Sequence, residues 1–221
     1  MTSGRAILLW RPRSSRKRKI GETHAHRRTG HCLALTLLGS YLADAYQGDI
    51  CRRKEVSGHL AEDVRQGGHA RKVMESYRTW FGEGPELSIL RMLGLFDRPA
   101  EEKALEALLR PPAIPGLTES LTGLRPNEWR TILARLRRSR LLAGEDWKNP
   151  GQLDAHPLVR EFFGEQLRSQ RAEAWKECNR RLYHHYRAIA PQLPDSFREM
   201  EPLFFGSHLR VPCRVVSPDV A

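Results

Sequence analysis

The feature that most constrains the fold is the spacing of apolar residues between positions 31 and 205. In one segment after another they recur at three- and four-residue steps, which places them on one face of an α-helix. In residues 30–46 the stripe consists of Leu33, Leu37, Leu38, Tyr41 and Leu42. Comparable stripes occur in residues 69–81, 86–96, 127–140, 157–167 and 171–190. The pattern predicts a mainly α protein whose helices each bury one face.

The chain is basic, but its charge is concentrated at the two ends. The formal net charge is +11, of which residues 1–30 contribute +8 and residues 206–221 contribute +1. The stretch between them is close to neutral, at +2. Residues 11–19 (RPRSSRKRK) indicate a solvated arm, because like charges repel one another; the alternative is a nucleic-acid or nuclear-import patch. We expect disorder in residues 1–29 and 207–221 and a folded part between them.

Composition and motifs exclude several classes of protein. No run approaches the ~18 apolar residues of a membrane helix, and the N-terminal charges follow the short apolar patch 6–10 rather than precede it. We therefore expect a cytoplasmic protein with no membrane partner. The chain lacks a GxxxxGK[ST] loop, a GxSxG elbow and an HExxH motif, so no catalysis by this chain alone is expected. No metal site is expected either, since the cysteines form no CxxC pair and His184 and His185 diverge on a helix.

A stretch of Gly and Pro residues separates the first two of three predicted folded units. The breaker GEGP at 82–85 separates a helical subdomain, residues 30–84, from a second unit that begins at residue 85. This second unit contains a helix at 86–96, another with Pro99 in its first turn, and a third at 127–140. A short strand pair, residues 141–143 and 152–154, then encloses a turn at 144–151. Three helices followed by a hairpin are the plan of a winged-helix domain, predicted here at residues 85–169.

The last folded unit is predicted at residues 170–206 as the start of a TPR-like helical repeat. The seam of 171–190 ends at Pro191, and Ser196 with Glu199 forms a capping box that starts another helix through Phe205. A single pair of such helices cannot bury its apolar face without stacked neighbours. We therefore expect the chain to be part of a longer protein, or a product of a shifted reading frame.

Three segments together resemble the bacterial NB-ARC or STAND signalling NTPases. GHCLALTLLGSYLADAYQGD (30–49) is similar to the "GxPLAL" helix of the family's helical subdomain. LDAHPLVREFFGEQL (153–167) is similar to the "MHD" region of its winged helix. AWKECNRRLYHHYRAIAPQLPDSFREMEPLF (174–204) is similar to the junction into its TPR-type array. Their order and spacing match the family, and the resemblance covers residues 30–205.

The resemblance implies a nucleotide-dependent switch in which ADP or ATP lies between a P-loop core and these subdomains. In the family, ADP locks a closed state, and exchange for ATP opens it for oligomerisation. The histidine that reaches the β-phosphate corresponds to His156, which also fits the N-cap of a helix opened by Pro157. The proline that stacks near the adenine corresponds to Cys32, which is a departure. Because the P-loop core is missing, no cofactor is expected for this chain by itself.

The resulting hypothesis is a regulatory fragment that completes an ADP site and packs on an NTPase core or another protein partner. Two alternatives remain. A stand-alone winged-helix DNA-binding protein would direct its third helix into the major groove. The residues that would contact DNA are Arg130, Arg135, Arg137 and Arg138. A helical adaptor or scaffold would instead expose the apolar seam of residues 171–205.

Overall fold

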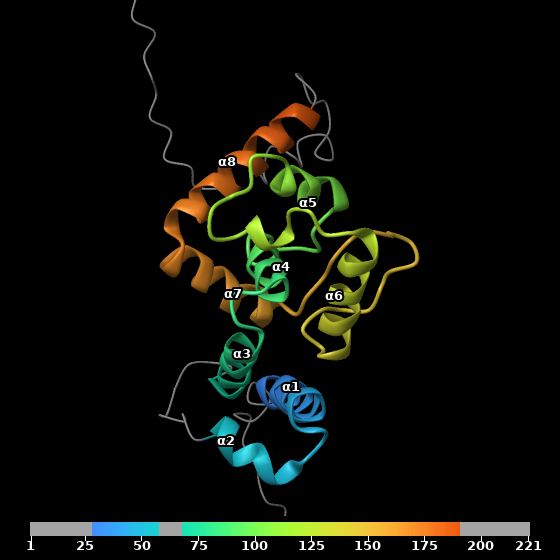
Figure 1. The fold of residues 1–221 in the computed structure, drawn as a ribbon, viewed down its shortest axis with the longest axis vertical. Coiled ribbons are helices and arrows are strands. Elements are labelled where there is room, and N and C mark those ends of the chain that lie inside the picture. Colours follow the sequence, from blue (N-terminus) through green and yellow to red (C-terminus); the bar gives the residue numbers. More distant parts are fainter. Residues whose placement is uncertain (1–27, 58–67, 191–221) are drawn as a thin grey trace, which may run out of the picture.

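The computed structural model describes residues 28–57 and 68–190, and these residues form a mainly helical molecule (Figure 1). The prediction of a mainly α fold is confirmed. The disorder expected in residues 1–29 and 207–221 falls almost entirely outside the described residues, as does the helix expected at 196–205. The elements are α1 (Arg28–Tyr46), η2 (Ile50–Arg52), α2 (Arg53–Ser57), α3 (Gly68–Phe81), α4 (Pro85–Leu93), α5 (Glu102–Leu109), η3 (Glu119–Leu121), α6 (Pro126–Arg138), α7 (Pro157–Gln170) and α8 (Ala172–Ile189).

Proline sets the start of several helices. Pro85, Pro126 and Pro157 occupy the first turns of α4, α6 and α7, where the missing N–H has no intrahelical partner in any case. Pro99 does not do the same for α5, and this prediction is wrong. The helix begins at Glu102, because Ala100 is drawn into an extended bridge with Leu153 instead.

Helix α4 is the centre of the core. Each residue from Glu86 to Leu93 is buried. The three polar side chains of this helix, Glu86, Ser88 and Arg91, tolerate burial because each has a hydrogen-bond partner in another segment.

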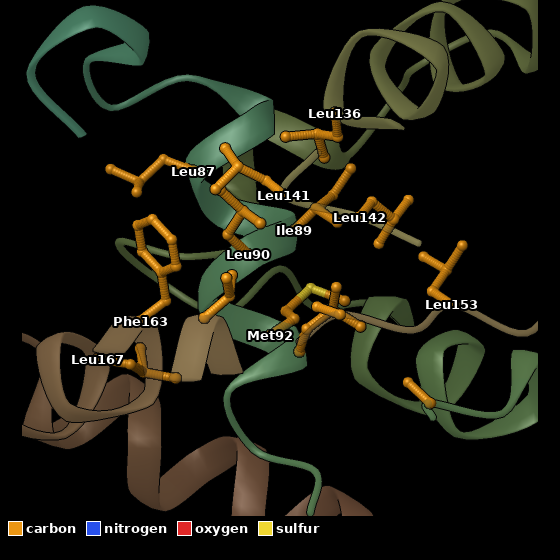
Figure 2. Close-up of a cluster of buried hydrophobic side chains, with 14 of the residues drawn as sticks. Leu87, Ile89, Leu90, Met92, Leu136, Leu141, Leu142, Leu153, Phe163 and Leu167 are labelled. Atoms are coloured by element: carbon orange, nitrogen blue, oxygen red, sulfur yellow. The ribbon is translucent and has the colours of Figure 1, made fainter. Parts of the chain in front are cut away.

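Figure 2 shows Leu87, Leu90 and Met92 of α4 between side chains of α6, α7 and the segment after α6. The labelled members of this cluster are Leu87, Ile89, Leu90, Met92, Leu136, Leu141, Leu142, Leu153, Phe163 and Leu167.

The hairpin expected at 141–143 and 152–154 is not found as a strand ladder in the described part of the chain. The N–H groups of Leu141 and Leu142 both donate to the carbonyl of Leu136, so they close the end of α6 rather than pair with a neighbouring segment. The remaining pairing consists of one bond from Ala143 N–H to the Asp154 carbonyl (2.7 Å) and the isolated antiparallel bridge between Ala100 and Leu153.

Helices α1 and α3 pack against each other and contact the rest of the molecule through α4, α6 and α7 (Figure 1). Asp44 on α1 accepts hydrogen bonds from Arg138 Nε (3.1 Å) and Ser139 Oγ (2.7 Å). The buried Tyr77 hydroxyl on α3 lies 3.3 Å from the Ser139 carbonyl. One continuous cluster of buried apolar side chains extends from α1 to α8.

Helix α8 packs on α5 and α7. Arg181 on α8 donates hydrogen bonds to the carbonyl of Leu108 in the last turn of α5 (3.1 Å) and to the carbonyl of Pro112 just after α5 (2.6 Å). The predicted seam is buried at Cys178, Leu182 and Tyr186. The second helix of the expected TPR-like pair lies outside the described residues. None of the helices within residues 28–57 and 68–190 is long and apolar enough to cross a membrane.

Candidate functional site at the start of helix α7

His156 is the N-cap of α7, as the sequence predicts. Its Nδ1 accepts a hydrogen bond from the backbone N–H of Leu158 (3.2 Å), and its side chain is exposed. A ring nitrogen that accepts a hydrogen bond carries no proton, so the neutral imidazole bears its hydrogen on Nε2. The cap therefore fixes the tautomer and leaves Nε2–H as a donor to the surroundings.

The segment that enters α7 is held by a nearby ion pair. Arg160, whose side chain is nearly buried, donates to Asp154 Oδ1 (3.0 Å), and the same oxygen accepts the N–H of Ala155 (2.8 Å). The positive end of the α7 dipole lies beside His156. One imidazole N–H at a helix N-terminus can bind one oxygen of a phosphate or carboxylate, and it requires further donors from elsewhere to hold a nucleotide.

Cys32 lies on the second turn of α1 and is exposed. Its carbonyl accepts the Thr36 hydroxyl (2.9 Å), which is a bond within the helix. Helix α1 contacts α3, and α3 in turn contacts α7, so the two nucleotide-site candidates are on elements that are linked through α3. The hydrogen bonds of Cys32 and His156 each stay within their own helix or its cap, and neither residue lines either of the two grooves beside α5.

The arginines of α6 are mostly committed to contacts within the protein. The Arg135 guanidinium lies over the Trp80 ring (4.5 Å to its centroid) and donates to Glu86 Oε1 (2.6 Å). Arg137 pairs with Glu145 (3.3 Å) and Arg138 with Asp44. Of the four candidate DNA contacts, Arg130 alone is exposed without an ion pair in the described part of the chain. The aromatic pair Trp80 and Phe81, both under the Arg135 guanidinium, was the signal in the sequence that could have pointed to the contact of Arg135.

Two grooves lie beside α5. The larger, of about 830 Å3, runs between α5, α6 and the turn at 144–151 and is floored by leucines and Trp129. The smaller, of about 650 Å3, lies between α5 and α8 and contains His184 and His185. Burial and the charge of Arg110 lower the pKa of His185. Within residues 28–57 and 68–190, no cluster of three or more His, Cys, Asp or Glu residues could hold a metal ion.

Comparisons with known proteins add no identification at this point. No protein-family model matches the chain, and neither the curated proteins nor the solved structures contain a significant match.

Proposed function

We propose that this chain is the regulatory, non-catalytic part of an NB-ARC or STAND-like nucleotide-dependent switch, and that it acts by packing on a P-loop NTPase core. It comprises a helical subdomain, a winged-helix-like domain and the start of a TPR-like array. The succession of α4, α5 and α6 and the return of segment 141–154 to Ala100 support the winged-helix part.

The observation that carries the proposal is the state of His156. Its Nδ1 is used by the cap, and its Nε2–H is left to donate outward at the positive end of a 14-residue helix. This is the chemistry that a β-phosphate oxygen of ADP requires, because the helix end favours the negative charge and the imidazole supplies a neutral donor. In the switch, His156 donates a hydrogen bond to the β-phosphate of ADP and thereby favours the closed state.

The hydrogen bond from His156 contributes too little free energy to bind a nucleotide by itself. A hydrogen bond to a charged group contributes about 1.5–3 kcal/mol, whereas micromolar affinity requires about 8 kcal/mol. The core must therefore supply the phosphate cradle, and hydrolysis also belongs to the core. The partner of this chain is accordingly a protein, and ADP or ATP is a ligand of the assembled pair.

The internal contacts of Arg135, Arg137 and Arg138 argue against the DNA-binding alternative. A recognition helix presents unpaired side chains to the groove, whereas three of these four arginines already have carboxylate partners. Arg130 alone cannot supply the several phosphate contacts on which duplex affinity depends.

The test is calorimetric titration of the full chain into an isolated P-loop core from a bacterial NB-ARC protein. We expect binding in the presence of ADP and binding at least about tenfold weaker with a non-hydrolysable ATP analogue, since the two ligands favour different states. His156→Ser keeps a capping oxygen but removes the Nε2 donor, so it should weaken the ADP-dependent binding by roughly tenfold or more.

The matched control is the melting temperature of the His156→Ser variant, which should be close to that of the unmodified chain because serine is a good N-cap. Equal binding with ADP and the ATP analogue would contradict the proposal. So would an unchanged affinity of the serine variant, or the absence of binding to the core under all conditions.

A further inference from the structure

The groove between α5 and α6 has an apolar floor and charged walls. Its volume of about 830 Å3 lies within the usual range for binding sites. Trp129 and Leu124 on its floor are half-buried, so they remain accessible to a partner. The apolar lining consists of Leu105, Leu109, Leu121, Leu124, Pro126, Trp129, Leu133 and Leu153.

The α5 wall of the groove carries two carboxylates. Glu102 and Glu106 lie one helical turn apart, and both side chains are exposed. Neither forms an ion pair with any described residue, whereas Glu128 on α6 and Glu173 and Glu177 on α8 do.

The opposite wall, on α6, carries Arg137, which pairs with Glu145, and Arg130, which forms no ion pair with a described residue. The α5 wall, with its two carboxylates beside the apolar floor, is therefore the side that fits an occupant combining a large apolar side chain with a cation.

The turn at 144–151 presents such a pair of side chains. Asp146 accepts the backbone N–H of Lys148 (3.0 Å) and the side-chain amide of Asn149 (2.7 Å). These hydrogen bonds fix the turn and lower the pKa of the Asp146 carboxyl. The turn holds Trp147 outward, 83% exposed, with the Lys148 ammonium 5.2 Å from the centre of its ring.

Among the large apolar side chains of the described residues, Trp147 is the most exposed. Tryptophans in this situation dominate the energy of protein interfaces, because burying the indole removes a large apolar area from water. Glu145 and Gly151, at the two ends of the turn, line the groove, whereas Trp147 is not among its lining residues. In Figure 1 the turn after α6 lies at the edge of the molecule. A single chain therefore carries an exposed indole and an apolar groove next to each other, and the indole does not fill the groove of its own chain.

We propose that two copies of this chain form a two-fold symmetric dimer in which the turn at 144–151 of each copy occupies the α5–α6 groove of the other. Trp147 packs on Trp129 of the second copy, and Lys148 pairs with Glu106 across the interface. A two-fold axis makes both exchanges equivalent, so one pair of complementary features produces two contacts and closes the assembly. The paired charges set the register, while the indole supplies most of the affinity.

Sedimentation velocity on the full chain over a range of concentrations tests the dimer. We expect a monomer–dimer equilibrium whose dissociation constant rises at least about tenfold in Trp147→Ala, as for an interface hot spot. Leu35→Ala is the matched control, because it removes another exposed apolar side chain, on α1 and outside the groove. It should leave the equilibrium unchanged. A monomer at all concentrations, or equal effects of the two variants, would overturn the proposal.

A charge exchange separates this dimer from any other mode of association. Glu106→Lys and Lys148→Glu each place like charges in both contacts of a homodimer, so each variant alone should dimerise several-fold more weakly than the unmodified chain. Mixing the two variants allows a heterodimer in which one contact pairs two unmodified residues and the other pairs the two exchanged residues. Both contacts are then between opposite charges, and dimerisation should return. If the mixture is no more associated than the separate variants, Lys148 and Glu106 do not meet across a two-fold interface and the proposal is wrong.

Discussion

The backbone of Gly94, at the end of α4, lies directly against the backbone of Gly164 in the middle of α7. A Cβ added to Gly94 would overlap the nitrogen and Cα of Gly164, and a Cβ added to Gly164 would overlap the carbonyl of Gly94. Neither position requires a positive φ, so steric room and not conformational freedom explains both glycines. This close approach allows the central helix and the helix that carries His156 to share one core.

Gly164→Ala should therefore destabilise the fold. The methyl group has backbone atoms as neighbours, which cannot move aside without separating α4 from α7, so we expect a loss of about 1–3 kcal/mol in the free energy of unfolding. Gly39→Ala is the matched control, because Gly39 lies on α1 with no atom within 4 Å of the added Cβ. Alanine there should be neutral or stabilising. Urea denaturation measures the free energy of unfolding of both variants. If Gly164→Ala is as stable as Gly39→Ala, α4 and α7 can move apart without loss of stability.

The sequence predicts the helices well because their evidence is local. The stripes of α1, α3 and α6 are visible as spacing alone, and the cap formed by His156 with Pro157 is confirmed. The role of His156 toward a phosphate stays a prediction. The expected strand at 141–143 is not found for a local reason, because Leu141 and Leu142 donate to the carbonyl of Leu136. The start of α5 is wrong because a distant segment decides it, since Ala100 bonds to Leu153 instead of starting the helix.

The contacts of the α6 arginines also depend on residues that are distant in the sequence. Their outward spacing on a helix is typical of a recognition helix, and nothing local distinguishes that function from packing. The deciding neighbours are far along the chain, because Arg135 contacts Trp80 and Arg138 contacts Asp44. The groove beside Trp129 was also missed, since its walls come from α5, α6 and the turn together.

Arg91 and Glu83 provide a prediction about pH. The Arg91 side chain is 1% exposed, and it donates two hydrogen bonds to Glu83 (2.6 and 3.2 Å), which itself is half exposed. The hydrogen bond and charge of Arg91 lower the pKa of Glu83. A depressed pKa in the folded state gives stability that is present above the unfolded value and is lost as the pH falls through the folded value.

Glu83→Gln should lower the free energy of unfolding at neutral pH by about 1–3 kcal/mol, less than for a fully buried pair because Glu83 reaches solvent. The variant should also lose less stability than the unmodified chain when the pH is lowered from about 7 to about 3. Urea denaturation at several pH values gives both quantities. If the two proteins show parallel pH dependence, the carboxylate of Glu83 does not compensate the buried charge.

A comparison of Arg135 with Arg130 separates packing from DNA recognition. Arg135→Ala removes the contact with Trp80 and the bond to Glu86, so we expect a loss of about 1–2 kcal/mol in stability. Arg130→Ala should change stability by less than about 0.5 kcal/mol, as for most surface residues. Thermal denaturation measures both. A marked fall in salt-dependent duplex binding on Arg130→Ala, with stability unchanged, would instead favour the recognition-helix interpretation.

The cysteines of the described residues should differ sharply in reactivity. Cys178 is buried in α8, and desolvation raises the pKa of its thiol to about 12, whereas Cys32 and Cys51 are exposed. The thiolate is the reactive species, so iodoacetamide at about pH 8 should modify Cys32 and Cys51 and leave Cys178 intact until the protein unfolds. Mass spectrometry of tryptic peptides, with and without urea, identifies the modified positions. Labelling of Cys178 at the rate of Cys32 in the native protein would mean that α8 leaves α5 and α7 readily. In that case the seam that buries Cys178 would be open to a partner helix, as the adaptor hypothesis requires.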